Sequence, residues 1–161
     1  MSTAELLAAY DAQLRMEAEV ADATEWHRHG PLVRARWGDS GFVSGRDLSG
    51  LTAGELEALV TDTLAWFRDE TSVTEVEWKT RRHDRADLLD LLTHHGFVAD
   101  EEETVMVGRA DLLDRPVDLP DGLVVRRAGE GGDLREDVTR AGLLQAEVFG
   151  HPPREVEERL A

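Results

Sequence analysis

Apolar and polar positions follow two different periods along the first 109 residues, and the changes of period predict alternating helices and strands. A capping box, "STAE", predicts a helix from Ser2 that ends in the polar stretch "EVADAT". The apolar positions of its one face are Leu6, Tyr10 and Leu14. The segments "PLVRARW" and "GFVSGRDL" flank a turn at residues 38–41 and predict a β-hairpin. The two faces of its first strand carry Leu32, Arg34 and Arg36 against Val33, Ala35 and Trp37.

A second capping box, "TAGE", predicts the longest helix of this region from Thr52. Its apolar stripe consists of Leu56, Leu59, Val60, Thr63, Leu64 and Phe67. The next segment, "VTEVEWKT" at residues 73–80, predicts a strand whose face with Val76 and Trp78 meets this helix. The order so far is hairpin, helix and strand.

Asp84 is expected to cap a short helix, "RADLLDLLTHH", in which Leu88, Leu91 and Leu92 point the same way. Gly96 stands where a left-handed residue ends a helix, and Phe97 is expected to pack back on it. "ETVMVGR" at residues 103–109 then predicts the last strand, in which Val105 and Val107 alternate against Met106.

The segment "LLDRPVDLPDG" predicts a domain boundary, because two prolines and an Asp-Gly pair fall between periodic segments. We expect a first domain at residues 1–114, a linker at 115–122 and the beginning of a second domain at 123–161. The second domain is expected to hold a strand "LVVRRA", a helix "LREDVTRAGLLQAEVF" closed by Gly150, and a further helix opened by Pro152 and Pro153. The predicted fold class is α/β (α+β), with a mixed sheet over residues 31–109 flanked by helices and a second copy that is incomplete. The helix from Ser2 is expected to cover an open side of the sheet.

The composition of the chain excludes several classes of partner and of chemistry. The chain has 161 residues and no cysteine, which excludes disulfides, thiolate metal sites and a cysteine nucleophile. A formal net charge of −16 argues against nucleic acid, which needs a basic face. No apolar run approaches the roughly 18 residues that span a bilayer, and the charged N-terminal segment does not resemble a signal peptide. We expect no membrane partner and a cytoplasmic location.

The histidines raise the question of a metal site. His27 and His29 have the spacing of two ligands on one strand face, and His83, His94 or His95 could complete a set. Because no cysteine or third ligand stands at motif spacing, we expect no metal. The segment "WKTRRHDR" at residues 78–85 is either a small anion-binding cluster or a strand end followed by the Asp84 cap, and the second reading is favoured. His83 and Asp84 with a serine would form a triad in residue types only, since no nucleophile-elbow motif supports it.

The order hairpin, long helix, strand, short helix ending in Gly-Phe, and strand resembles the later half of a GNAT-superfamily N-acetyltransferase. The segment "PDGLVVRRAGEGGDLREDVTRAGLLQAEVFG" resembles the first strand and helix of another copy. The whole chain is therefore similar to tandem, two-domain GNAT proteins of the actinobacterial type, on segments such as "ELLAAYDAQLR", "GPLVRARWGDSGFVSGRDLSGL" and "GFVADEEETVMVG".

The resemblance implies an acetyl-CoA loop, Gln/Arg-x-x-Gly-x-Gly/Ala, at the start of the long helix, where backbone N–H groups approach the pyrophosphate. The corresponding positions here are Gly50, Thr52 and Gly54, with Asp47 at the basic or amide position and Glu55 nearby. These carboxylates repel a pyrophosphate, so we expect no acetyl-CoA bound to this chain alone.

The resemblance also implies a tyrosine four residues before the glycine of Gly-Phe, as the acid that protonates the departing thiolate. Leu92 occupies that position and cannot transfer a proton. The resemblance thus implies no catalytic residue in the first domain. In a completed second domain, Glu147 and Phe149 are the residues expected to face the acceptor.

Two functions remain open. The chain is part of an N-acetyltransferase that transfers the acetyl group of acetyl-CoA to a small-molecule or peptide amine, with the catalytic loop beyond Ala161. Alternatively, it is a noncatalytic interaction or ligand-binding module with the same fold. The apolar residues of the incomplete segment, including Leu123, Val125, Leu144 and Val148, are expected to dock on the first domain or to join two copies in a homodimer.

Overall fold

The computed structural model describes residues 1–112 and 116–150. The chain divides into two compact units, Met1–Val107 and Gly108–Ala161, and the linker expected at residues 115–122 falls within the second. The helix expected from Pro152 lies outside the described residues. None of the described helices is both long enough and apolar enough to cross a membrane.

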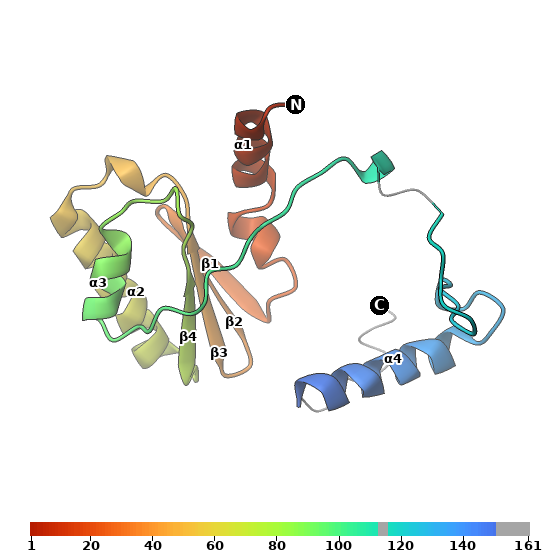
Figure 1. The fold of residues 1–161 in the computed structure, drawn as a ribbon. Coiled ribbons are helices and arrows are strands. Elements are labelled where there is room, and N and C mark those ends of the chain that lie inside the picture. Colours follow the sequence, from red (N-terminus) through yellow and green to blue (C-terminus); the bar gives the residue numbers. More distant parts are fainter. Residues whose placement is uncertain (113–115, 151–161) are drawn as a thin grey trace. The chain divides into compact units, whose positions relative to one another are not determined.

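The first unit contains a four-stranded mixed sheet in the order β1-β2-β3-β4 (Figure 1). Strands β1 (Glu25–His29), β2 (Leu32–Trp37) and β3 (Ser40–Gly45) form an antiparallel meander, and β4 (Glu75–Lys79) pairs with β3 in parallel. The structure confirms the α+β class and the predicted hairpin of β2 and β3. The alternation of apolar residues did not predict β1, which is mostly exposed at the edge of the sheet.

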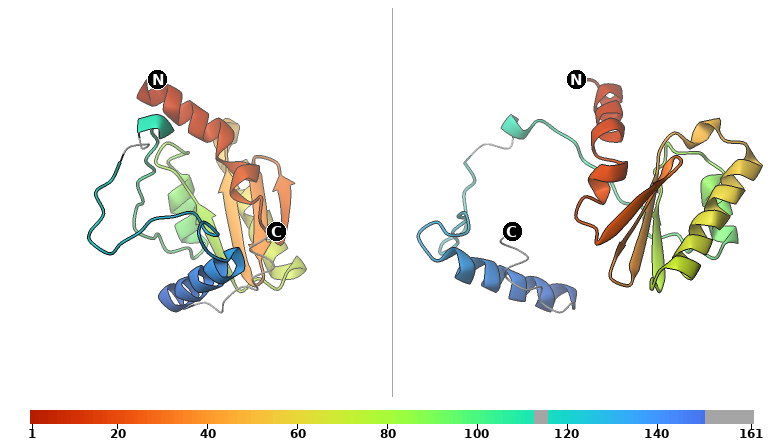
Figure 2. Two further views of the ribbon diagram at one scale, coloured as in Figure 1. Left: turned by 90° about the vertical axis from the view of Figure 1, so that its right-hand side faces the viewer. Right: turned by 180° about the vertical axis from the view of Figure 1, so that it is seen from behind.

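Helices α2 (Ala53–Glu70) and α3 (Leu88–His94) cover one face of the sheet (Figures 1 and 2). The buried residues of this core are Leu32, Val43, Leu48, Leu56, Val60, Phe67, Trp78, Leu88 and Leu92. Gly41 of β3 lies so close to helix α2 that an added Cβ would be 2.8 Å from the Phe67 ring. The predicted stripe of α2 and the inward face of β4 are both confirmed.

The end of α3 forms as the Gly-Phe motif predicts. Gly96 has φ +91°, which favours glycine, and the Phe97 N–H donates to the Leu92 carbonyl at 3.1 Å. The Phe97 ring then meets Trp78 edge to face, with 6.1 Å between centroids. The helix start differs from the prediction, because α3 begins after Asp87, and the Asp84 carboxylate binds Arg15 instead of capping the helix.

The opposite face is covered by the segment that follows α1 (Thr3–Gln13). Ser2 forms the predicted capping box, but α1 ends earlier than expected and none of its residues is buried. A short 3₁₀ helix, η1 (Met16–Glu19), packs on the sheet in its place. This second core consists of Met16, Val20, Val33 and Ala35. Met16 enters it with φ +63°, a conformation that costs a non-glycine residue about 1 kcal/mol or more and is held by this packing.

Two predicted strands are absent. The segments "ETVMVGR" at 103–109 and "LVVRRA" at 123–128 have no strand pairing, and Val105, Met106 and Val125 are exposed. A β-strand requires a neighbour for its N–H and C=O groups, and neither segment has one among the described residues. Alternation alone was therefore an insufficient signal.

In the second unit, the 3₁₀ helix η3 (Ala110–Leu112) precedes helix α4 (Leu134–Phe149). Asp133 caps α4 by accepting from the Glu136 N–H. Gly150 ends the helix with φ +69°, and this end was predicted from the sequence. The helix keeps its large apolar side chains exposed, namely Leu134, Leu143, Leu144, Val148 and Phe149.

Candidate functional site

The parallel pair β3 and β4 defines where a ligand site is expected. Both strands run in the same direction, end at Gly45 and Lys79, and are followed by connections to α2 and α3 on the same face. Ligands of open α/β sheets bind outside the carboxyl ends of such strands. The GNAT resemblance led us to expect a cofactor loop at the same place, in the connection from β3 to α2.

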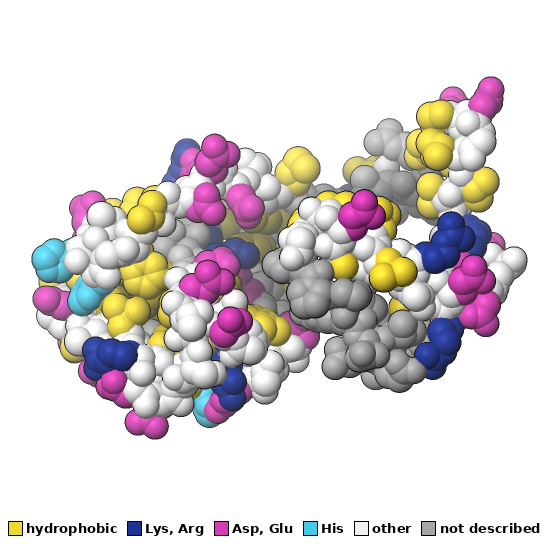
Figure 3. All heavy atoms as spheres, turned by 90° about the horizontal axis from the view of Figure 1, so that it is seen from below, with side chains coloured by type: hydrophobic (Ala, Val, Ile, Leu, Met, Phe, Trp, Pro, Cys, Tyr) yellow, Lys and Arg dark blue, Asp and Glu magenta, His cyan; other side chains and the backbone are white. Residues whose placement is uncertain are grey.

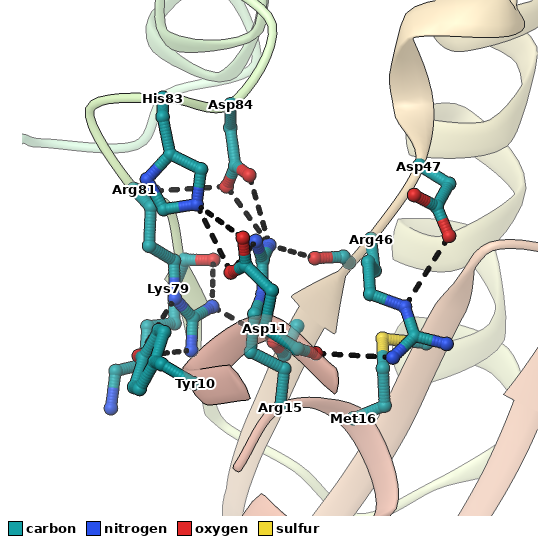
Figure 4. A network of polar contacts seen from close by, with 12 residues as sticks. Tyr10, Asp11, Arg15, Met16, Arg46, Asp47, Lys79, Arg81, His83 and Asp84 are labelled. Carbon is teal, nitrogen blue, oxygen red and sulfur yellow. Dashed lines mark hydrogen bonds and ion pairs between the residues drawn. The ribbon is translucent and has the colours of Figure 1, made fainter. Parts of the chain in front are cut away.

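This place is filled by a cluster of the chain's own side chains, which we call the strand-end cluster (Figure 4). Its members are Tyr10, Asp11, Arg15, Glu19, Ser44, Arg81, His83 and Asp84. They come from α1, the link between α1 and η1, η1 itself, the end of β3 and the connection after β4. The cluster therefore ties the N-terminal segment to the carboxyl ends of both parallel strands.

Arg15 lies at the centre of the strand-end cluster, with its side chain 2 % exposed. Its Nη1 donates to Asp11 at 3.0 Å, and its Nη2 donates to Asp84 at 2.9 and 3.2 Å and to the carbonyl of Gly45. Burial lowers the pKa of this guanidinium, but the hydrogen bonds to Asp11 and the charge of Asp84 outweigh burial and raise it. Arg15 is thus a buried permanent charge held between two carboxylates.

A second ion pair, Arg81 with Glu19, lies beside Arg15, and both side chains are almost fully buried. Ser44 joins the two partners, since its Oγ donates to Glu19 at 2.6 Å and accepts from Arg81 Nη1 at 2.9 Å. The Tyr10 hydroxyl accepts from Arg81 at 3.3 Å. Every polar group of this pair therefore has a partner within the protein.

His83 forms the outer edge of the cluster. Its Nε2 lies 3.0 Å from both carboxylate oxygens of Asp11. Burial raises the pKa of Asp11, but hydrogen bonds from Arg15 and His83 outweigh it, and the pKa is lowered. The Ser44 hydroxyl is engaged by Glu19 and Arg81, so no serine–histidine–aspartate triad is assembled here.

The loop before α2, where the resemblance led us to expect an acetyl-CoA loop, carries the two carboxylates Asp47 and Glu55. Gly50 ends the 3₁₀ helix η2 (Leu48–Gly50), and Thr52 is the N-cap of α2. The Thr52 N–H and hydroxyl both donate to Glu55 Oε2 at 2.7 Å, and the Glu55 N–H donates back to Thr52 at 3.3 Å. These hydrogen bonds lower the pKa of Glu55, which keeps it ionised. Asp47 is highly exposed and paired with Arg46 at 3.3 Å.

The other glycine of this loop, Gly54, has open space around the position of a Cβ, as does Gly50. No close backbone approach therefore requires glycine at either position. Leu92, at the position of the expected acid, is 3 % exposed in the core and offers no proton.

Among residues 1–112 and 116–150, no group of three or more His, Asp or Glu side chains is placed so that it could hold a metal ion. His27 bonds to Glu25 at 2.8 Å, and the His94 and His95 rings pack edge to face at the end of α3. His29 lies on the same face of β1 as His27, but no third side chain among these residues joins the two histidines in a metal site.

The cations of the "WKTRRHDR" segment are already neutralised. Arg82 pairs with Glu102, and Arg85 pairs with Asp87 and donates to the Leu51 carbonyl. In the face shown in Figure 3, acidic side chains are spread widely and the few basic ones lie beside them. This segment presents no open anion site.

Glu147 and Phe149, the residues expected on the acceptor side, lie in the last turn of α4 and are exposed.

No family model, curated protein or solved structure matches this chain. The geometry of the strand-end cluster thus carries the functional argument.

Sequence reasoning missed the central members of this cluster, Arg15, Glu19 and Arg81. One signal was available: Asp11, Arg15 and Glu19 recur at four-residue spacing, which places opposite charges on one helical face. That pattern indicates a charged face but not its distant partners.

Proposed function

We propose that Met1–Val107 is a noncatalytic domain of the GNAT type that serves as the structural domain of an N-acetyltransferase. In this proposal the acetyl-CoA loop and the catalytic acid lie outside this unit. The enzyme as a whole transfers an acetyl group from acetyl-CoA to a small-molecule or peptide amine.

The observation that carries the proposal is the buried Arg15 at the carboxyl ends of β3 and β4. A bound cofactor would have to displace this side chain and leave Asp84 and Asp11 without their cation. Removing one member of a buried charge network costs about 3–5 kcal/mol, which weakens the binding of any ligand that needs it. The acidic start of α2 and the leucine at position 92 support the same conclusion.

The order of elements supports the GNAT assignment. Hairpin β2–β3, long helix α2, parallel strand β4 and short helix α3 ending in Gly-Phe follow one another as the resemblance implies. The last strand of the resemblance, at 103–109, is the element that lacks support.

Calorimetric titration of the 161-residue chain with acetyl-CoA at low ionic strength tests the proposal. We expect no heat of binding. Micromolar binding that is abolished by Gly50→Asp would show that the loop before α2 is a working cofactor site and would overturn the proposal.

A second candidate is a noncatalytic interaction module, and the exposed apolar segments favour it. Met106 is 91 % exposed in the first unit and Val125 is 82 % exposed in the second, which is typical of surfaces that a partner covers. We propose a homodimer through the C-terminal segment as the simplest form of such a module. Light scattering after limited proteolysis tests it: a dimer whose mass falls to a monomer when the segment is clipped supports the module, and a monomer throughout contradicts it.

A further inference from the structure

We propose that Arg34 is the anchor of a carboxylate-binding site between β1, β2 and α2, independent of the proposed function. Arg34 lies in the middle of β2, directly opposite His27 of β1 and Val43 of β3. It shares a face with Leu32, which is buried in the core beneath α2. Its guanidinium consequently stacks on Trp66 of α2, with Cζ 4.5 Å from the ring centroid.

Arg34 is unusual in having no carboxylate partner. Every other arginine of Met1–Val107 forms an ion pair. Arg34 forms no hydrogen bond or ion pair with any described residue, and its buried Nε has no acceptor. The chain contains 34 acidic residues against 18 lysines and arginines, so the missing carboxylate partner of Arg34 does not reflect a shortage of carboxylates. A guanidinium with five N–H donors and no acceptor is ready for an external one.

The surroundings hold this guanidinium in place. Trp66 is fixed by edge-to-face contact with Phe67, with 4.8 Å between centroids, and with His27 at 5.6 Å. The pKa of His29 is lowered, first by burial and then by the positive charge of Arg34. The lowered pKa favours the neutral form of His29, so Arg34 is the permanent cation beside it.

The charges around Arg34 select the ligand class. Asp62 of α2 acts electrostatically on both Arg34 and His29 without pairing with either. Glu25 of β1 is already paired with Arg36 at 2.7 Å, so Asp62 is the carboxylate that acts on the site. A dianionic phosphate is repelled by Asp62 more strongly than a monoanion. The planar fork of a stacked arginine pairs with both oxygens of one carboxylate, so the site selects a carboxylate, either on a small acid or at a peptide chain end.

The test is an NMR titration that follows the Arg34 Nε–H and the Trp66 indole N–H. Acetate, and phosphate as the rival anion, are added at constant ionic strength. We expect saturable shifts of both signals with acetate at a dissociation constant of about 1–50 mM, and weaker shifts with phosphate. An absence of saturable shifts with acetate, or tighter binding of phosphate, would overturn the carboxylate assignment.

Variants make the test specific to Arg34. Arg34→Gln and Arg34→Lys are expected to weaken acetate binding about tenfold or more, because lysine keeps the charge without the fork. Asp62→Asn is expected to tighten it by removing a nearby negative charge. Arg28→Gln is the matched control, since Arg28 is on the same hairpin, opposite Val33 on the other face, and paired with Glu17. Equal losses in Arg28→Gln and Arg34→Gln would show a general charge effect and refute the site.

A short peptide with a free or an amidated C-terminus identifies the source of the carboxylate. Tighter binding than acetate that is lost on amidation assigns the site to a chain end. Binding no tighter than acetate assigns it to a small acid. If Arg34→Gln does not fold, Arg34→Lys and Asp62→Asn still decide the proposal, and unchanged affinity in both would refute it.

Discussion

The two faces of the sheet are closed by different chemistry. Helices α2 and α3 close one face mainly with apolar side chains, whereas the other face combines a small apolar core around Met16 with the charged strand-end cluster. Apolar contacts tolerate small shifts, but buried charges require every partner in place. The difference indicates that specific ion pairs hold the N-terminal segment on the second face, so this face is not an open binding surface.

The largest effect is expected for Arg15→Met. The variant leaves Asp84, Asp11 and the Gly45 carbonyl without their shared donor, which should lower the free energy of unfolding by about 3–5 kcal/mol. Urea denaturation measures the loss. Arg28→Met is the control, because its exposed ion pair should contribute no more than about 1 kcal/mol. Equal effects of the two substitutions would mean that the ion pairs of the strand-end cluster stabilise the fold no more than an exposed ion pair does.

The apolar face is compared through two leucines of one helix. Leu92→Ala should lower the free energy of unfolding by about 2–5 kcal/mol, because Leu92 is 3 % exposed in the core. Leu89→Ala should cost about 0.5 kcal/mol or less, because Leu89 is 50 % exposed. Thermal and urea unfolding measure both. A large loss of stability in Leu89→Ala would show that the side of α3 with Leu89 is buried, which contradicts the structure.

A smaller effect is expected at the start of α2. Thr52→Ala removes the hydroxyl that accepts from the Glu55 N–H and donates to the Glu55 carboxylate, and should cost about 1 kcal/mol. Thr61→Ala on the exposed side of the same helix should be neutral or slightly stabilising, since alanine is the better helix former. Urea unfolding of the two variants separates the cap from a general effect of alanine.

The smallest effect concerns pH at the edge of the strand-end cluster. The pKa of Asp11 is lower in the folded chain than its ordinary value of 3.8, so its contribution to stability is complete above about pH 4. That contribution is lost as the pH falls through the lowered folded pKa. Urea midpoints between about pH 5 and pH 2 should therefore fall less steeply in Asp11→Asn than in the native chain. Parallel curves would show that Asp11 has the same pKa in both states.

Local rules predicted most of the apolar face. The capping boxes at Ser2 and Thr52, the stripe of α2 and the glycine stop at Gly96 each depend on residues close together in the sequence, and each is found in the structure. The chemistry of four or five consecutive residues decides such features.

The remaining elements depend on distant partners. Strand β1, "EWHRH", pairs through its backbone and buries little, so its side chains carry no apolar alternation. The segment at 103–109 has the alternation but no neighbouring strand. In the candidate site, Asp84 was expected to cap a helix, because its partner Arg15 lies 69 residues earlier and no local pattern connects them.

The most direct test of a closed strand-end site is a double-mutant cycle between Arg15 and Asp84. Arg15→Met, Asp84→Asn and the double variant are compared with the native chain by urea unfolding. We expect the double variant to lose less than the sum of the single losses, with a coupling energy of about 1–3 kcal/mol, because the two side chains are in contact at 2.9 Å. Losses that add to within about 0.5 kcal/mol would show that Arg15 and Asp84 do not stabilise the fold together. That result would contradict the claim that this ion pair closes the strand-end site.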